Sequence, residues 1–222
     1  MFWVLLALVL CWLIFREVRS TTVVPVDMPL SRKVSKPYIS VLAALALLSL
    51  WQPIHMWQFQ RHLSAISTVL ADSHIAHIHC NTVIDTLFDQ NSMNIGHASP
   101  ETGEIAFQYP WCNTLLAYLR HPGRADRQEL SSLGLLTHES MHVRGELNEA
   151  LTECEAVQRN LRAARLLGVP DGTARKNALD YYHSVYLPRA VREGNPDKYF
   201  SDECAPGKLL DERLSDSTWA SH

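Results

Sequence analysis

The chain has 222 residues, of which 47% are hydrophobic and 19% are charged, and its formal net charge is -3. This composition excludes a disordered tail, and the length is sufficient for a domain with a buried core. The small negative charge gives no basic surface for phosphates, so no nucleic-acid partner is expected. Apolar residues are concentrated in the first 57 positions. This excludes a polytopic transporter and predicts a membrane anchor at 1–57 followed by a domain at 58–222.

The anchor contains two apolar runs, Met1 to Phe15 and Tyr38 to Trp57. Both are long enough to span a bilayer, the first only just. A secretory signal peptide carries its positive charge before the apolar stretch, whereas Arg16 follows it here, so we expect this segment to be retained. The alternative is that one of the two runs is a buried helix.

The loop at 16–37 between the two runs is rich in basic residues. It holds Arg16, Arg19, Arg32, Lys33 and Lys36 against two acidic residues, Glu17 and Asp27. Short loops rich in Lys and Arg stay in the cytoplasm, and Trp51 and Trp57 suit the outer headgroup region. The sequence therefore predicts an integral membrane protein with two spans in the lipid bilayer and both termini on the extracytoplasmic side.

Beyond the anchor, the spacing of apolar and turn-forming residues predicts mostly helices. The second span is expected to continue as a helix over 58–72. Alternating Ile105, Phe107 and Tyr109 predict one strand within 103–109. Further helices are predicted at 113–120, 127–144, 147–167 and 174–186, with no regular structure after Pro196. The expected fold class is mainly α with a small β component, an α+β domain preceded by two transmembrane helices.

Four cysteines lie outside the apolar runs: Cys80, Cys112, Cys154 and Cys204. Outside the cytoplasm such residues are expected to oxidise, and four cysteines allow three pairings. We favour Cys80 with Cys112 and Cys154 with Cys204, because nearer neighbours close smaller loops. Four buried free thiols are the alternative.

The helix predicted at 127–144 contains the pattern HExxH, formed by His138, Glu139 and His142. Two histidines four residues apart lie on the same helix face, so their imidazoles can converge on one Zn²⁺ ion. Glu139 points to the neighbouring side, where it can act as a general base on water. A solvated helix with an ion-paired glutamate is the alternative interpretation.

The next helix opens with the sequence NEALTE, from Asn148 to Glu153. With HESMH before it, this segment resembles the zincin metallopeptidases, and specifically the gluzincins, in which an NExxSD-type helix follows HExxH. The resemblance implies a zincin-like domain with His138, His142 and Glu149 as zinc ligands. It also implies Glu139 as general base and Glu153 as the acid that supports a ligating histidine. Glu149 and Glu153 are one helical turn apart, so both can face the metal.

Two departures from the gluzincin pattern affect the third ligand. The six residues between His142 and Glu149 are fewer than the family usually has, so the turn must be tight. His142 to Gly145 also resembles the HxxG of metzincins, but that pattern would place Asn148, a poor zinc ligand, at the third position.

Other acidic residues near the turn are less suitable ligands. Glu146 is too close to Gly145, and Glu155 lies towards the opposite helix face from Glu149. Glu149 is therefore preferred, with Glu153 next.

Three protein ligands leave a fourth zinc position for water, and the implied reaction is hydrolysis of a peptide bond in a peptide or protein substrate. Tyr181, Tyr182 and His183 are candidate donors to the developing oxyanion by residue type, with core packing as their alternative role. The resemblance also implies that the strand at Ile105 to Tyr109 is a sheet edge that pairs with an extended substrate.

The leading hypothesis is a membrane-anchored zinc metallopeptidase acting on the extracytoplasmic side. The alternative is an inactive or structural zinc-binding module that serves as an interaction subunit of a membrane protein assembly. A third possibility is a disulfide-stapled binding domain without metal. A structural site differs from a catalytic one because removal of its ion unfolds the domain.

Overall fold

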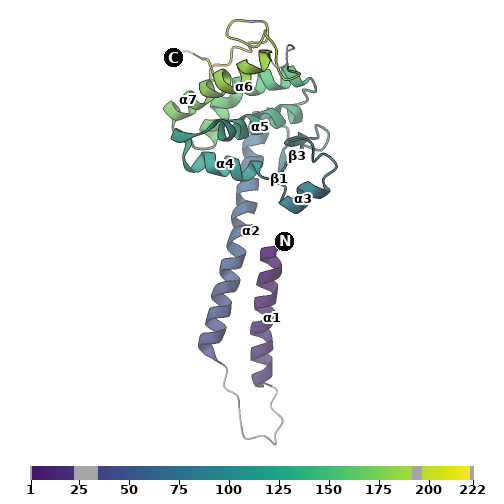
Figure 1. Cartoon of the computed structure of the whole chain (residues 1–222), viewed down its shortest axis with the longest axis vertical. Coiled ribbons are helices and arrows are strands. Elements are labelled where there is room, and N and C mark those ends of the chain that lie inside the picture. Colours follow the sequence, from purple (N-terminus) through teal and green to yellow (C-terminus); the bar gives the residue numbers. More distant parts are fainter. Residues whose placement is uncertain (1, 23–34, 192–196, 221–222) are drawn as a thin grey trace, which may run out of the picture. The chain divides into compact units, whose positions relative to one another are not determined.

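The computed structural model describes residues 2–22, 35–191 and 197–220. The chain forms two compact units, unit 1 (Met1–Phe59) and unit 2 (Gln60–His222). Figure 1 shows that helices dominate both units and that one small sheet lies in unit 2. The structure thus confirms the mainly helical fold class with a small β component.

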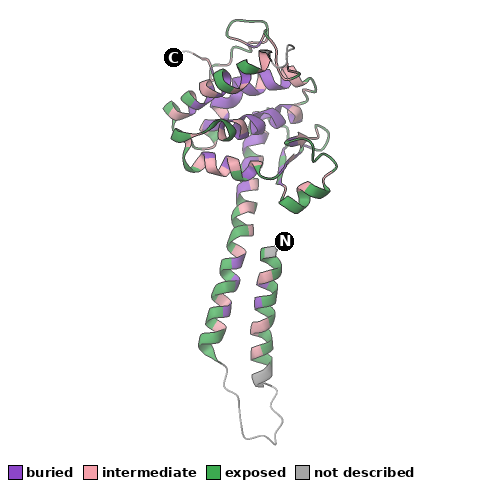
Figure 2. Cartoon of the chain, in the orientation of Figure 1, coloured by how far each residue is buried: buried purple, intermediate pink, exposed green. Residues whose placement is uncertain are grey.

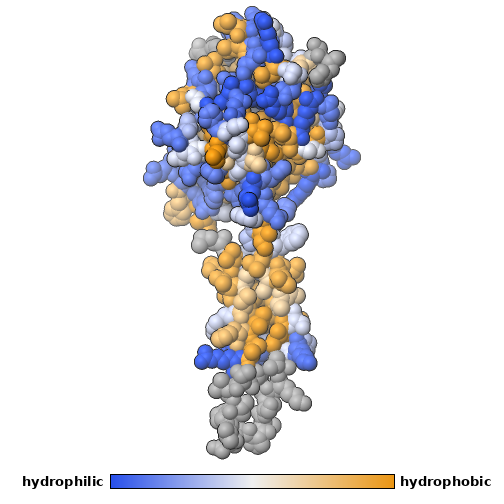
Figure 3. All heavy atoms as spheres, turned by 180° about the vertical axis from the view of Figure 1, so that it is seen from behind, coloured by the Kyte–Doolittle hydropathy of each residue, from blue (hydrophilic) through white to orange (hydrophobic). Residues whose placement is uncertain are grey.

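Unit 1 consists of α1 (Phe2–Thr22) and the first part of α2 (Lys36–Leu70). The two helices pack through Leu10, Leu42 and Ala46, and their surfaces are largely apolar (Figure 3). Within the described residues, α2 is the one helix long and apolar enough to cross a membrane, by length and composition. The second predicted span therefore lies in a helix of spanning length, whereas the first stays a prediction.

The loop predicted at 16–37 is shorter in the structure. α1 continues through Arg16 and Arg19 to Thr22, and α2 begins at Lys36. The prediction ended the helix where the apolar residues end, but charged side chains can extend to water from a helix that continues past an apolar run. Residues 23–34, which include Asp27, Arg32 and Lys33, lie outside the described residues.

The last turns of α2, in unit 2, hold strand β1 (His77–Cys80) through side-chain hydrogen bonds. We call these bonds the α2–β1 ladder: the N–H groups of Ala76, Ile78 and Cys80 donate to Thr68 Oγ1, Ser64 Oγ and Gln60 Oε1, at 3.0, 2.8 and 3.0 Å. Four residues of helix rise about 6 Å, and two residues of strand rise about 6.6 Å. Because these spacings match, every second amide of the strand finds an acceptor on the helix.

The sheet has three strands, in the order β1, β3 (Glu104–Phe107), β2 (Gly96–Ala98). β1 pairs with β3 in parallel, with Ile78 opposite Ile105, and β2 pairs with β3 antiparallel. The predicted strand at 103–109 is confirmed as β3. The prediction that it forms a sheet edge is wrong, because β1 and β2 flank it on both sides. The sequence pattern predicts neither of these strands, nor the short helix α3 (Val83–Phe88) between them.

Four helices complete unit 2: α4 (Trp111–Arg120), α5 (Arg127–Arg144), α6 (Glu149–Leu166) and α7 (Asp171–Tyr181). They confirm the four predicted helices. The last ends earlier than predicted and continues as a π-helical turn (Tyr182–Tyr186) and a 3-10 turn (Leu187–Val191). α5 lies at the centre, because it contacts α4, α6, α7, β2 and β3 and is mostly buried (Figure 2).

Two disulfides join distant parts of unit 2. Cys80–Cys112 connects the end of β1 to the first turn of α4, and Cys154–Cys204 connects α6 to the C-terminal segment. Both pairings are the predicted ones, so the alternative of four free thiols is wrong.

The C-terminal segment at 197–220 has no helix or strand, as predicted. It is nevertheless fixed along α6, because Arg159 and Arg162 of that helix pair with Glu212 and Asp216. Irregular backbone is therefore held here by side-chain contacts with a helix.

α7 approaches α5 closely at Gly134. A Cβ at this position would lie 2.4 Å from Cε2 of Tyr181 and 2.6 Å from its hydroxyl oxygen, which is closer than non-bonded atoms pack. Tyr181 is itself 3% exposed, so its ring has little space to move into. The missing side chain at Gly134 is what allows this packing distance.

We expect Gly134→Ala to lower the free energy of unfolding by about 1–3 kcal/mol, the usual cost of overpacking. Gly172→Ala is the matched control, because Gly172 also lies in a helix but a Cβ there has no atom within 4 Å. Alanine at this control position can raise the free energy of unfolding by up to about 1 kcal/mol. Urea denaturation of the full chain in detergent measures both, and equal stability of the two variants would contradict the close approach of α5 and α7.

Candidate metal centre

Helix α5 carries the HExxH residues, and its ends are set by local signals. It begins at a capping box, in which Asp126 accepts from the amide of Glu129 and Glu129 accepts from the amide of Asp126. It ends at Gly145, whose φ of +114° lies in the left-handed region. Between these ends, His138 and His142 are four residues apart and lie on one face.

The connection from α5 to α6 spans only residues 145–148, so Glu149 is the first residue of α6. The side chain of Asn148 caps α6 by accepting from two amides of its first turn. Glu146 enters the site through its backbone, because its carbonyl accepts from Nδ1 of His142 at 2.7 Å. The short linker that departs from the gluzincin pattern is thus compatible with the predicted third ligand.

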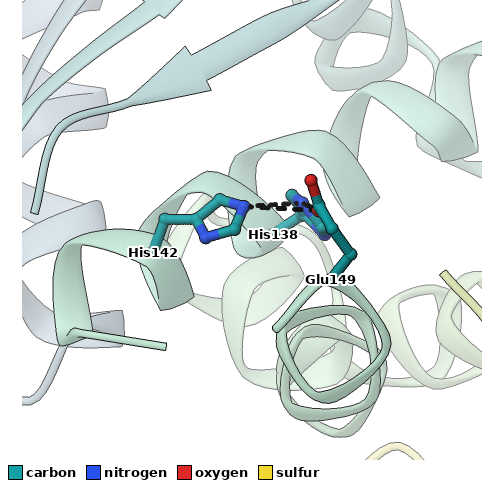
Figure 4. A group of neighbouring side chains, drawn as sticks. All are labelled: His138, His142 and Glu149. Atoms are coloured by element: carbon teal, nitrogen blue, oxygen red, sulfur yellow. Dashed lines mark hydrogen bonds and ion pairs between the residues drawn. The ribbon is translucent and has the colours of Figure 1, made fainter. Parts of the chain in front are cut away.

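The side chains of His138, His142 and Glu149 converge on one point (Figure 4). Nε2 of His138 lies 3.1 Å from Nε2 of His142 and 3.2 Å from Oε2 of Glu149. Nε2 of His142 lies 3.5 Å from the same oxygen. Ligand atoms around a tetrahedral Zn²⁺, with bonds of about 2.0–2.1 Å, are about 3.3 Å apart. The three separations therefore fit a single ion of this size.

Hydrogen bonds behind the two imidazoles determine which nitrogen faces this point. Nδ1 of His138 donates to Oε2 of Glu153 at 2.8 Å, and Nδ1 of His142 donates to the carbonyl of Glu146. In a neutral imidazole the other nitrogen then carries a lone pair. Two lone pairs and a carboxylate oxygen repel one another unless a cation or a proton lies between them. Zinc binds such a combination of nitrogen and oxygen ligands.

The electrostatic environment of this point also favours positive charge there. Burial lowers the pKa of His138, but hydrogen bonds to Glu149 and Glu153 outweigh it and raise the pKa to about 10. The hydrogen bond from His138 lowers the pKa of Glu149 to about 2. Burial lowers the pKa of His142. A divalent cation would take the place of the proton on Nε2 of His138, while Nδ1 keeps the proton that it donates to Glu153.

Glu153, the predicted supporting acid, is 3% exposed. Its Oε2 accepts from His138, and its Oε1 accepts from the hydroxyl of Tyr181 at 2.6 Å and lies 3.4 Å from the guanidinium of Arg189. Burial opposes ionisation, but the hydrogen bond from His138 and the charge of Arg189 bring the pKa of Glu153 below its usual value. Since both of its oxygens are engaged in this way, the geometry favours Glu149 as the third ligand.

Glu139 lies beside the two histidines and is 4% exposed. Its Oε2 has no hydrogen-bond partner among the described residues, and burial raises the pKa of Glu139 to about 7. Gly96 of β2 leaves room for this side chain, because a Cβ at Gly96 would lie 3.0 Å from Oε1 of Glu139. A buried carboxyl without a partner is costly, and such groups are concentrated at catalytic sites.

The site opens into a pocket of about 800 Å³. All three residues of β2 line it. The C-terminal segment contributes Lys198, whose Nζ lies 3.3 Å from Oε1 of Glu149. It also contributes Tyr199, whose ring meets that of His138 edge to face at a centroid distance of 5.6 Å. Residues far apart in the sequence therefore form one cavity around the three converging side chains.

Only one of the three predicted oxyanion donors, Tyr181, lines the pocket, and its hydroxyl already donates to Glu153. Tyr182 packs against Tyr186 and Trp219, and His183 is exposed. Neither lines the pocket, because residues one and two positions after Tyr181 in a helical segment point to other faces than Tyr181 does. The structure therefore does not place these two residues beside the three converging side chains.

Sequence reasoning misses four residues of the site: Gly96, Arg189, Lys198 and Tyr199. They belong to other segments of the chain than HExxH, and no local motif marks them. An isolated glycine such as Gly96 is only a weak signal of a turn or bulge. Arg189, Lys198 and Tyr199 reach the pocket only through tertiary packing.

No family model, no curated protein and no solved structure matches this chain. The chemistry of the site is therefore inferred from its own residues and their geometry.

We expect the full chain, purified in detergent, to hold about one Zn²⁺ ion, and Glu149→Gln to weaken zinc binding at least about 100-fold, because an amide is a poor zinc ligand. Glu155→Gln is the matched control, since Glu155 also lies on α6 but pairs with Arg144 at 2.9 Å. Elemental analysis and competition with a chromophoric chelator measure both variants. Equal zinc affinity of the two would exclude Glu149 as a ligand.

Proposed function

We propose that this protein is a membrane-anchored zinc metallopeptidase that hydrolyses peptide bonds on the extracytoplasmic side. The observation that carries the proposal is the convergence of His138, His142 and Glu149 in an open pocket, beside the buried and unpaired Glu139. Two imidazoles and one carboxylate are a ligand set of catalytic zinc sites. We therefore infer Zn²⁺ as the cofactor.

The number of ligands favours a catalytic role over a structural one. Structural zinc sites are closed by four protein ligands, whereas catalytic sites have three and keep one position open. In the part of the chain that the structure describes, the candidate group has three members, and the pocket reaches all of them. An inactive or structural zinc module in a membrane assembly is the alternative. Removal of the metal distinguishes this module from a catalytic site.

The residues around the metal position divide the chemistry among them. Zn²⁺ would polarise the carbonyl of the scissile peptide and make water more acidic. Glu139 takes a proton from the attacking water at its unpaired Oε2 and delivers it to the leaving amine. Glu153 accepts a hydrogen bond from the proton-bearing Nδ1 of His138 and so holds this imidazole in the tautomer whose unprotonated Nε2 faces the pocket. Tyr181 and Arg189 position Glu153 and stabilise its charge.

Strand β2 and Tyr199 are suited to bind the substrate. β2 is an edge strand and its residues line the pocket, so an extended peptide can pair with its backbone. Tyr199 takes the role predicted for Tyr181, Tyr182 and His183, because its ring lies against His138 in the pocket. A phenol at this place can donate to the oxyanion that develops on the substrate.

Two features support the extracytoplasmic location. Disulfides form and persist in oxidising compartments, and unit 2 has two of them. α2 is long and apolar enough to anchor the chain in a bilayer. With α1 as a second span, both termini would face the extracytoplasmic side, and the partners would be the bilayer, a peptide or protein substrate and other membrane proteins.

We expect Glu139→Gln to keep zinc and to lower the rate of peptide hydrolysis by about 10²–10⁴, the usual contribution of a general base. Glu129→Gln on the same helix is the matched control, because glutamine preserves a capping box. The measurements are hydrolysis of a quenched-fluorescent peptide library and the zinc content of the same preparations. If Glu139→Gln is as active as Glu129→Gln, the mechanism is wrong.

Removal of zinc separates the catalytic from the structural hypothesis. On chelation, a catalytic site loses hydrolysis while the circular dichroism of the chain is unchanged, whereas a structural site loses its fold. Zinc in the wild-type chain without hydrolysis of any library peptide would support the inactive module.

A further inference from the structure

The segment from α3 to β2 exposes many apolar side chains. The exposed fractions are 64% for Ile84, 74% for Leu87, 85% for Phe88 and 95% for Met93. No residue of α3 is buried, and Figure 2 shows the helix as almost entirely exposed. We define the α3 patch as Val83, Ile84, Leu87, Phe88, Met93 and Ile95, all of which are at least half exposed. Apolar surfaces of this kind mark interaction sites.

Polar side chains of α3 and of the residue after it face the rest of unit 2, whereas the apolar side chains of the helix face outward. Thr86 Oγ1 accepts from the amide of Tyr109 at 2.9 Å. Asp89, just after the helix, accepts from the side chains of Asn81 and Gln108 at 2.9 and 2.7 Å. The four apolar residues of the helix lie at i, i+1, i+4 and i+5, which is a single face. A helix in water is expected to bury such a face, so this orientation indicates an apolar partner.

The α2–β1 ladder places α3 at the end of unit 2 where the chain enters it. β1 runs antiparallel to the last turns of α2, so that Ala76 lies at Thr68 and Cys80 at Gln60. α3 begins three residues after Cys80. Because Cys80 lies at Gln60, α3 starts near the Gln60 end of the ladder. In the sequence, Gln60 comes three residues after Trp57. Tryptophan near the end of a span prefers the headgroup region.

The α3 patch shares two residues with the lining of the pocket of the candidate site. Met93 and Ile95 belong to the patch and also line the pocket, where Gly96 and His97 of β2 follow them. A partner that covers Met93 and Ile95 of the patch therefore also borders the entrance to the pocket.

We propose that the α3 patch inserts into the interfacial region of the bilayer that anchors α2. Aliphatic side chains with an aromatic ring among them bind at this depth. The carboxylates of the segment are engaged elsewhere, since Asp85 closes a capping box with Thr82 and Asp89 binds Asn81 and Gln108. The contact attaches unit 2 to the membrane at a second point besides α2.

This bilayer contact also defines a substrate class, a step that rests on the function proposed above. Because the patch borders the pocket, insertion holds the pocket entrance at the membrane surface. The substrates are then peptide segments that emerge from the bilayer or lie on its surface.

Photocrosslinking tests the contact without requiring hydrolysis. Phe88→p-benzoylphenylalanine is made in the full chain, which is reconstituted in a phosphatidylcholine nanodisc. The matched control is the same substitution at Leu209, which is 83% exposed but lies in the C-terminal segment. After irradiation, mass spectrometry identifies the adducts. We expect phospholipid adducts at position 88 to exceed those at position 209 at least about tenfold.

Equal lipid adducts at the two positions would overturn the proposal. Adducts at position 88 to a second copy of the chain would overturn it too, because the patch would then be a protein interface. Adding Leu87→Ser to the position-88 crosslinker removes an apolar side chain from the same face, and α3 has no buried residue to disturb. Lipid adducts should then fall several-fold, and an unchanged yield would contradict insertion.

The substrate class is tested with one cleavable peptide in two forms, free in solution and attached to a lipid of the nanodisc. For Leu87→Ser we expect kcat/KM to fall at least about threefold for the attached form, by loss of positioning, and to be unchanged for the free form. An equal change for both forms would refute the substrate class. Lipid adducts at position 88 without hydrolysis of either peptide would support the bilayer contact and overturn the metallopeptidase, whereas hydrolysis without such adducts would do the reverse.

Discussion

One buried carboxylate holds the candidate site together. A buried charge costs several kcal/mol unless it is paired and hydrogen-bonded, and Glu153 of α6 meets this requirement with His138 of α5, Tyr181 of α7 and Arg189 of the following 3-10 turn. Loss of any one of these partners leaves the carboxylate less compensated. The interaction that orients the imidazole therefore also fixes the helices around the pocket relative to one another.

The local part of this site can be predicted from the sequence, and the remainder cannot. HExxH lies on one helix, where spacing alone puts His138 and His142 on the same face. Glu149 lies on the next helix, and the short connection at 145–148 and the packing of α6 on α5 bring it to the two histidines. Arg189 and Tyr199 reach the pocket through packing between distant segments, and no fixed spacing in the sequence relates them to HExxH. The type of Tyr181 suggests contact with substrate, but its close approach to α5 at Gly134 brings the hydroxyl to Glu153 instead.

The elements of the fold also divide into those that local sequence signals predict and those that depend on tertiary contacts. α5 has the predicted ends because Asp126 and Gly145 act on the residues next to them. β1 and β2 have four and three residues, and strands this short are stabilised by their neighbours instead of by their own pattern. The apolar residues of α3 suggest burial, yet they face outward, because the hydrogen bonds of Thr86 and Asp89 determine the orientation of this segment.

The α2–β1 ladder has a consequence for self-association. The outer edge of a sheet normally presents unpaired backbone groups to which any extended chain can add. Side chains of α2 occupy the outward amides of Ile78 and Cys80, so a second copy of the chain finds no amides to pair with there. Growth of the sheet is restricted to β2, where an added strand must run beside the pocket. The same three polar side chains thus protect one edge against aggregation and leave the other edge for recognition.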